Sequence, residues 1–155
     1  METGYEVGEV MSRNVLTIRP DATILASAKL MAERKLGSIV VCEKSQVVGI
    51  LTEQDLSRKV LAKGLDAKKT YVADIMTKKV YTTSPEKDIY EAMIQMGQKK
   101  VKHLPVLKEG RLVGIVSFKD IIRIEPDLID MVSFKSTLTK GQNNSIFPAR
   151  AEIRE

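Results

Sequence analysis

One unit of sequence occurs twice in this 155-residue chain, and the repetition limits the possible folds more than any other feature. When Val7 is aligned with Val72, the two copies run on without a gap and share about thirteen identities over about fifty positions. The identical pairs include Val15 and Val80, Pro20 and Pro85, Gly49 and Gly114, and Asp55 and Asp120. A gapless match of this length indicates two similar halves that share one core.

Each copy predicts the element order β-α-β-β-α. In the first copy, the pattern predicts a strand at 15–18, a helix with an apolar stripe of Ile24, Ala28 and Met31, strands at 39–42 and 47–51, and a helix from 53 to about 63. In the second copy, it predicts a strand at 80–83, a helix with a stripe of Ile89, Met93 and Met96, strands at 104–107 and 112–116, and a helix from 118 to about 124. Asp21 and Ser84 are predicted N-caps, and four-residue polar turns at 43–46 and 108–111 are suited to hairpins.

The strands that begin at Val47 and Leu112 are apolar without alternation, which predicts burial on both faces. One copy cannot cover such strands alone. We therefore expect an α/β (α+β) fold in which two β-α-β-β-α repeats pack sheet to sheet about a pseudo-twofold axis, with two equivalent clefts. The expected boundaries are 5–63 for the first repeat, 64–70 for a linker, 71–124 for the second repeat and 125–155 for a C-terminal tail. The tail has a short helical pattern at 126–132 and a polar, loop-like stretch at 136–145, and is either docked on a dimer mate or a flexible arm.

The net charge of +5 favours anionic partners, either a nucleic acid or a small molecule that carries phosphate. Nucleic acid is the weaker candidate, because the chain has no tryptophan and only 5% aromatic residues for base stacking. The apolar stretches are too short to span a bilayer and no secretory signal is visible, so we expect a cytoplasmic protein without a membrane contact.

The sequence offers no residues for catalysis or for a metal. Cys42 is the single cysteine and His103 the single histidine, so neither a disulfide nor a zinc site of these residues can form. His103 has no visible partner for general-base chemistry, and no Walker phosphate-binding loop or nucleophile elbow occurs. We expect no enzyme activity and no obligatory cofactor.

The sharpest local pattern is the segment from Gly49 to Asp55, which is echoed from Gly114 to Asp120. In each, a strand ends at a hydroxyl residue, Thr52 or Ser117, with an acid three positions later. One interpretation is a capping box, which stabilises a helix start by about 1 kcal/mol without a ligand. The other is a ligand site, in which the hydroxyl and free amides of the helix start bind phosphate and the aspartate accepts from ribose hydroxyls. The glycine inside each apolar strand marks a close approach of backbone that a capping box does not explain.

The doubled unit, with Gly-Ile-Leu-Thr-Glu-Gln-Asp at 49–55 and His-Leu-Pro-Val at 103–106, resembles a pair of CBS domains, the tandem called a Bateman module. The resemblance covers about residues 5 to 124. It implies that the chain binds an adenosine compound (AMP, ADP, ATP or S-adenosylmethionine) in clefts between the repeats. It also implies a disc-like homodimer that regulates another protein, whose identity the sequence does not show, by conformational change.

Carried over by position, the resemblance implies that Thr52 and Ser117 contact phosphate and that Asp55 and Asp120 hold ribose hydroxyls. The full set of ligand-binding residues that we expect is Asn14, Val15, Thr17, Ser38, Thr52, Asp55, Lys79, Val80, Thr82, Lys102, His103, Pro105, Ser117, Lys119 and Asp120. The segments 14–17 and 79–82 are expected to line an adenine pocket largely through backbone groups.

The two copies differ where the ligand is expected. The second has Lys-His-Leu-Pro at 102–105 where the first has Gly-Ser-Ile-Val at 37–40, and it is the more basic copy. We therefore predict unequal sites, with stronger phosphate affinity where the basic groups converge. Two other functions stay open: a structural dimerisation module without a ligand, and nucleic-acid binding through the basic face, which would weaken steeply with salt.

Overall fold

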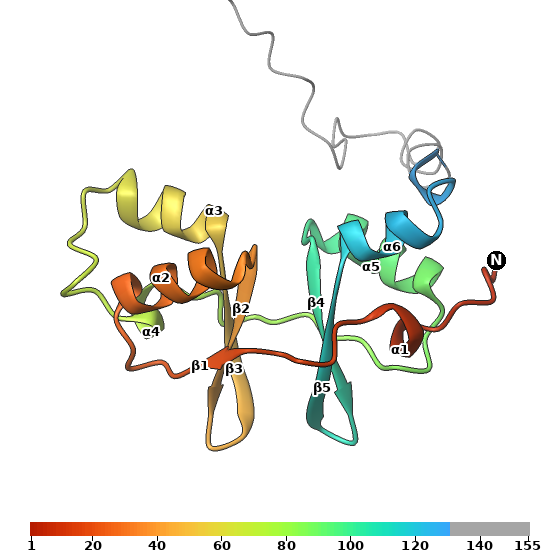
Figure 1. Ribbon diagram of the computed structural model, residues 1–155, viewed down its shortest axis with the longest axis horizontal. Helices are drawn as coiled ribbons and strands as arrows, with labels where there is room; N and C mark the ends of the chain where they lie inside the picture. Colours follow the sequence, from red (N-terminus) through yellow and green to blue (C-terminus); the bar gives the residue numbers. More distant parts are fainter. Residues whose placement is uncertain (131–155) are drawn as a thin grey trace, which may run out of the picture.

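Two β-hairpins with the same register stand side by side at the centre of the computed structural model, which describes residues 1–130 (Figure 1). In the first hairpin, β2 (Ser38–Glu43) pairs antiparallel with β3 (Gln46–Thr52); in the second, β4 (His103–Lys108) pairs with β5 (Arg111–Ser117). The predicted strands are confirmed, and each is longer than predicted. The ladders continue to the pairs 43–46 and 108–111, so each turn has two residues rather than four.

The first predicted strand of each repeat is shorter than expected. β1 (Thr17–Ile18) pairs parallel with β2, whereas the second repeat keeps only an isolated bridge between Thr83 and Val106. In both repeats a proline follows two residues after the pairing ends, and proline has no backbone N–H to donate to a ladder. The sheets therefore have three strands in the first half and two in the second.

The predicted N-caps Asp21 and Ser84 are wrong. Helix α2 (Ile24–Arg34) is capped by Thr23, whose Oγ1 accepts from the Ala26 amide at 3.1 Å. Helix α5 (Ile89–Lys99) is capped by Asp88, whose Oδ1 accepts from the Tyr90 amide at 2.8 Å. Each helix begins at an isoleucine that is at most 2% exposed, so burial of the apolar stripe fixes where the helix starts.

The second helices of the two repeats differ in their winding. In the first repeat, α3 (Glu53–Asp55) continues into a π-helix, η1 (Leu56–Leu61). In the second repeat, α6 (Phe118–Ile124) is a regular α-helix. The first ends two residues before the predicted position 63. A π-helix is rare and is often found at functional sites.

Two short helices that the sequence pattern did not reveal exchange places between the halves. Helix α1 (Val7–Val10) belongs to the first repeat but packs in the core of the second half, and α4 (Val72–Ile75) packs in the core of the first half. Figure 1 shows α1 on the side of β5 and α4 beneath α2. Backbone pairing continues the exchange, with Ser12 bridged to Ile115 and Thr77 bridged to Ile50.

The exchange explains the strand glycines. A Cβ at Gly49 would lie 2.9 Å from Cγ of Met76 and 3.2 Å from the carbonyl oxygen of Thr77, and a Cβ at Gly114 would lie 2.9 Å from Cγ of Met11. The close backbone approach that these glycines predicted is therefore real, but it is made by the exchanged segments of the chain itself. A bound ligand is not needed to explain it.

Burial follows the two-layer arrangement, with one correction. Ile50 and Ile115 in β3 and β5 are only partly buried, so these strands are not buried on both faces as predicted. The strands covered on both faces are their partners β2 and β4, in which Val40 and Pro105 are buried although they lie on the face opposite the core residues. The predicted α/β fold of two paired repeats is confirmed.

Leu128 closes the second core and is fully buried, so the predicted tail is anchored at its start. The rest of that tail, from residue 131 on, lies outside the described residues. Within residues 1–130, every helix is too short or too polar to cross a membrane.

Candidate functional site

The two hydroxyl-led helix starts form complete capping boxes. Thr52 Oγ1 accepts from the Asp55 amide at 3.2 Å, and Asp55 Oδ2 accepts from the Thr52 amide at 3.0 Å. In the second repeat, the same pair of bonds joins Ser117 and Asp120 at 3.2 and 2.9 Å. The capping interpretation is thus satisfied by the chain alone, and the hydroxyl and one carboxylate oxygen at each position already have partners before any ligand binds.

Two predicted residues lie directly across the hairpins from the hydroxyls. Ser38 pairs with Thr52, and His103 pairs with Ser117. Their neighbours in the strands, Ile39 and Leu104, lie in the two cores, so the alternation of a strand places Ser38 and His103 on the opposite face. That face of each hairpin is turned toward the other hairpin (Figure 1).

His103 bridges the seam between the halves. A Cβ at Gly37 would lie 3.4 Å from His103 Nε2 and 3.7 Å from Oε2 of Glu53, so the imidazole of the second repeat rests on the first. Burial lowers the pKa of His103; the carboxylates of Asp120 and Glu53 oppose this shift, and nearby lysines reinforce it. The imidazole is therefore held in its neutral form to lower pH than an exposed one, and a phosphate beside it would favour the proton.

The two aspartates have different neighbours. Asp55 is 8% exposed, and its Oδ1 forms an ion pair with Lys59 at 2.9 Å. Asp120 is only partly buried; its Oδ2 accepts from the Ser117 hydroxyl at 2.7 Å, and its Oδ1 accepts no hydrogen bond from residues 1–130. Of these two aspartates, only Asp120 therefore has a carboxylate oxygen without a hydrogen-bond partner among residues 1–130.

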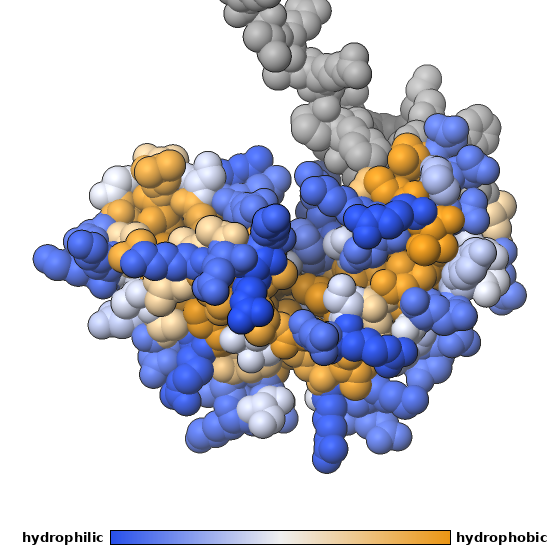
Figure 2. Space-filling model, viewed as in Figure 1, coloured by the Kyte–Doolittle hydropathy of each residue, from blue (hydrophilic) through white to orange (hydrophobic). Residues whose placement is uncertain are grey.

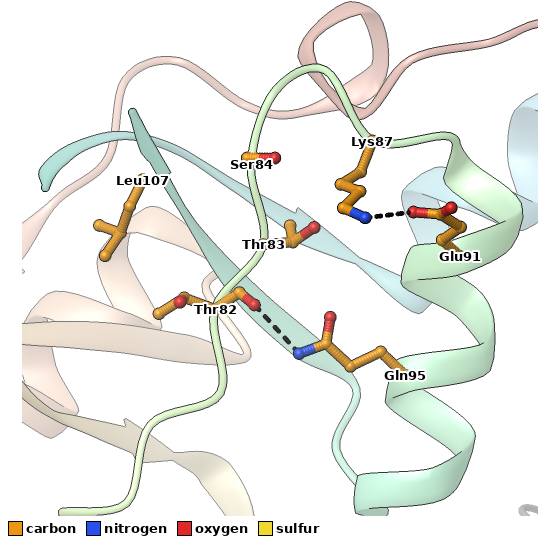
Figure 3. Close-up of a pocket in the computed structure, with 7 residues that line it drawn as sticks. All are labelled: Thr82, Thr83, Ser84, Lys87, Glu91, Gln95 and Leu107. Atoms are coloured by element: carbon orange, nitrogen blue, oxygen red, sulfur yellow. Dashed lines mark hydrogen bonds and ion pairs between the residues drawn. The ribbon is translucent and has the colours of Figure 1, made fainter. Parts of the chain in front are cut away.

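A groove of about 510 Å³ lies within the second half, between α5, β4 and the segment before α5 (Figure 3). Of the predicted residues, only Thr82 lines it, and its carbonyl oxygen accepts from Gln95 Nε2 at 3.0 Å. Figure 3 shows Lys87 and Glu91 facing each other at the start of α5, with an ion-pair distance of 3.0 Å. The groove residues that the sequence analysis missed are Thr83, Ser84, Lys87, Glu91, Gln95 and Leu107.

A signal for the groove was present in the comparison of the two copies. At the positions aligned with Thr83, Lys87 and Gln95, the first repeat has Ile18, Ala22 and Leu30, which pack against its core. The polar replacements line the open groove of the second repeat.

The remaining predicted residues differ from one another in exposure and in contacts. Lys79 and Lys99 both place an ammonium group over the ring of Tyr81, at 5.7 and 5.2 Å from its centroid. Pro105 is buried in β4, on the same face as His103. Lys102 and Lys119 are exposed at the helix start of the second repeat. Asn14 and Thr17 are exposed, and Val15 and Val80 are partly buried.

The structure thus brings together one group of the predicted residues at the helix-bearing end of the seam: Ser38, Thr52, Asp55, Lys102, His103, Ser117, Lys119 and Asp120. In the space-filling view a notch separates the halves on this side, with hydrophilic residues along both flanks (Figure 2). Thr82 lies in a different place, in the groove. Among residues 1–130, no three His, Cys, Asp or Glu side chains are placed to hold a metal ion.

The CBS domain model matches the chain twice, at residues 7–62 and 72–127. The chain belongs to the CBS domain family. The CBS domain-containing protein YhcV of Bacillus subtilis is 31% identical, over 74% of this chain and 81% of that protein. A Methanopyrus kandleri protein is 38% identical over 79% of this chain, and the mitochondrial CBS domain-containing protein CBSX3 of Arabidopsis thaliana is 36% identical over 66%. This chain spans 64% and 52% of the length of those two relatives.

Solved structures of CBS proteins have the same fold. A protein with CBS domains from Burkholderia ambifaria is 32% identical, with a TM-score of 0.74 over 79% of this chain and 95% of that one. The CBS domain pair of protein MJ0100, solved with 5'-methylthioadenosine and S-adenosylmethionine, is 26% identical, with a TM-score of 0.70 over 77% of this chain and 94% of that one. A CBS-CP12 protein from bloom-forming cyanobacteria is hexameric; it is 34% identical, with a TM-score of 0.73 over 84% of this chain and 75% of that one.

Most of the matching relatives are CBS domain proteins rather than enzymes. A homoserine O-acetyltransferase of Methanococcoides burtonii also matches, at 37% identity, but the matched region is only 24% of that protein.

Proposed function

We propose that this CBS pair is a regulatory module that senses an adenine nucleotide, or S-adenosylmethionine, in the seam between its repeats. The observation that carries the proposal is the helix start of the second repeat. There, Asp120 binds the Ser117 hydroxyl through Oδ2, while its Oδ1 accepts no hydrogen bond from residues 1–130. The charge of Asp120 also acts on His103, which lies against the other repeat. A ligand bound at this point contacts both halves and changes how they pack.

The roles follow from the chemistry of each group. The aspartate accepts hydrogen bonds from ribose hydroxyls, and Ser117 donates to phosphate once its hydroxyl is released from Asp120. Lys102, Lys119 and His103 supply positive charge for the phosphate, and 79–82 with 14–17 supply backbone groups for adenine. The adenosine compounds bound by the MJ0100 pair support this ligand class for the fold.

The signal consists of a shift between two arrangements of the halves. A ligand shifts such an equilibrium only by its difference in affinity for the two arrangements. A ligand that touches His103 and Gly37 together stabilises the arrangement in which they are in contact. We further propose a cytoplasmic homodimer without an obligatory cofactor or catalytic activity, which passes the change to a partner protein.

The test is titration calorimetry with AMP, ADP, ATP and S-adenosylmethionine. We expect at least one to bind, and at one hundred times its Kd to stabilise the fold by about 2.7 kcal/mol in thermal unfolding. Asp120→Asn is expected to weaken binding while keeping the shape of the side chain, and the exposed Asp127→Asn serves as the matched control. If none of the four ligands binds at millimolar concentration, the proposal is refuted.

A structural dimerisation module is the second candidate, because both capping boxes are complete without a ligand. In that case Asp55→Ala and Asp120→Ala lower the free energy of unfolding through lost capping and alter no ligand response. Thermal unfolding of the purified chain with and without the four ligands distinguishes the candidates, since a purely structural module is stabilised by none of them.

A further inference from the structure

Both oxygens of the Asp55 carboxylate already have a partner within the chain. Its Oδ2 accepts from the Thr52 amide at 3.0 Å, and its Oδ1 pairs with the Lys59 ammonium at 2.9 Å. The Asp55 side chain is 10% exposed, whereas the Lys59 side chain is 42% exposed and lies over it.

Lys59 is held in this position by more than the carboxylate. Its Nζ also donates to the Ile75 carbonyl oxygen at 3.1 Å and lies 3.5 Å from the Thr77 hydroxyl oxygen. Both acceptors belong to the exchanged segment that pairs with β3. The ammonium therefore connects η1, the helix start of the first repeat and the segment donated to its half.

The second repeat has no such group. Ile124 occupies the position aligned with Lys59, in a regular α-helix rather than a π-helix, and is 45% exposed. Asp120 keeps one oxygen that accepts no hydrogen bond from residues 1–130. The two repeats thus share a backbone motif. Of their two aligned aspartates, only Asp120 has a carboxylate oxygen without a hydrogen-bond partner among residues 1–130.

We propose that Lys59 blocks the ribose-binding position of the first repeat, so that each chain takes one adenosine ligand, at Asp120. This inference rests on the proposed function and adds its stoichiometry and the residue that determines it. A ribose at Asp55 would have to displace the ammonium from a nearly buried carboxylate and from the Ile75 carbonyl oxygen, so its binding would be offset by the loss of contacts that the chain already makes. A ribose at Asp120 displaces no cation.

The exchange of the two aligned residues tests the proposal. Calorimetry with AMP and with S-adenosylmethionine is run on the full chain and on the variants Lys59→Ile and Ile124→Lys. We expect one site per chain in the unchanged protein and a second site in Lys59→Ile. In Ile124→Lys, the new lysine lies one turn from Asp120, and we expect binding at least about tenfold weaker, the factor that loss of a hydrogen bond to a charged group causes.

Matched controls separate these effects from a change of charge. Lys63→Ile removes an exposed lysine one turn beyond Lys59, and Gln98→Lys adds an exposed lysine to the second half. We expect both to bind as the unchanged chain does. Far-ultraviolet circular dichroism of every variant verifies that the fold is kept.

Each result has a distinct meaning. Two equal sites in the unchanged chain, or one site that Lys59→Ile leaves single, would overturn the inference while the proposed function stands. Binding of neither ligand overturns the proposed function and this inference with it. One site that is weakened by Ile124→Lys and doubled by Lys59→Ile supports both.

Discussion

The two helix starts of this CBS pair have the same backbone and opposite availability. Thr52 and Ser117 cap their helices through the same pairs of hydrogen bonds, with lengths that agree within 0.1 Å. Yet Asp55 is buried under a lysine, whereas Asp120 retains an open oxygen. The comparison teaches that repetition preserves what folding needs, the glycine, the cap and the ladder. The side chains around the cap are free to differ, and they determine whether a ligand can enter.

The largest expected effect tests whether the two exchanged segments contribute equally to folding, as the shared backbone of the two repeats implies. A valine at Gly114 would place a Cβ 3.0 Å from the Ser12 carbonyl oxygen, and at Gly49 3.2 Å from that of Thr77. Backbone oxygens cannot move aside as a methionine side chain can. We expect Gly114→Val and Gly49→Val each to lower the free energy of unfolding by about 3 kcal/mol in urea denaturation. A loss confined to one of them would show that the exchanged segments are not equivalent.

The next effect concerns the caps of the first helices. Thr23 caps only its own helix, whereas the Asp88 carboxylate also accepts from the Thr3 and Gly4 amides at 2.8 and 3.2 Å. We expect Asp88→Ala to cost about 2 kcal/mol and Thr23→Ala about 1 kcal/mol, measured by urea denaturation at pH 7.

The pH dependence of that difference has a definite sign. Burial raises the pKa of Asp88, but hydrogen bonds from Tyr90, Thr3 and Gly4 outweigh it, and the folded pKa is lowered. The contribution of Asp88 is therefore present above its ordinary pKa and is lost as the pH falls through the folded pKa. The gap between the two alanine variants should narrow in acid, and a gap that widens would contradict the assignment.

The sequence predicted the paired hairpins, the repeat and the two hydroxyl-led helix starts because these depend on local patterns: apolar strands, short turns and a hydroxyl before an acid. It did not predict the exchange of α1 and α4. Each is a single helical turn, and its burial depends on distant parts of the chain: the Val7 amide donates to the Lys87 carbonyl oxygen, and the Val72 amide donates to that of Ala22. The close approach at the strand glycines was predicted, but not what makes it. Only the folded chain shows that Met76 lies against Gly49 and Met11 against Gly114.

The inequality of the sites was predicted from the basic residues of the second repeat, and this prediction is still to be tested. The structure adds a different cause in the first repeat. Lys59 could not be singled out from the sequence, because a lysine four residues after an aspartate on a helix is ordinarily an exposed pair of small effect. Its importance arises from burial of Asp55 and from the Ile75 carbonyl, both of which are tertiary features.

A smaller effect measures how far Lys59 stabilises the first half. We expect Lys59→Met, which keeps most of the length of the side chain and removes its charge, to lower the free energy of unfolding by about 1 kcal/mol. The value is modest because the lysine side chain is 42% exposed and solvent weakens the pair. Lys63→Met, at an exposed position, is the control and should leave the unfolding curve unchanged. Equal curves for both variants would show that the ion pair has no structural role.

The smallest effect concerns His103, whose side chain lies against the other repeat. Burial lowers the folded pKa of His103 below its ordinary value, so in the absence of a ligand the unfolded chain takes up a proton first as the pH falls. Its contribution to stability is complete above the ordinary pKa of histidine, near 6.5, and decreases as the pH falls from there toward the folded value. His103→Gln removes this component, so its loss of stability between pH 7 and pH 5 should be smaller than that of the unchanged chain. A bound phosphate would raise the folded pKa and flatten the same slope, so a slope unaffected by a saturating nucleotide would place the phosphate away from His103.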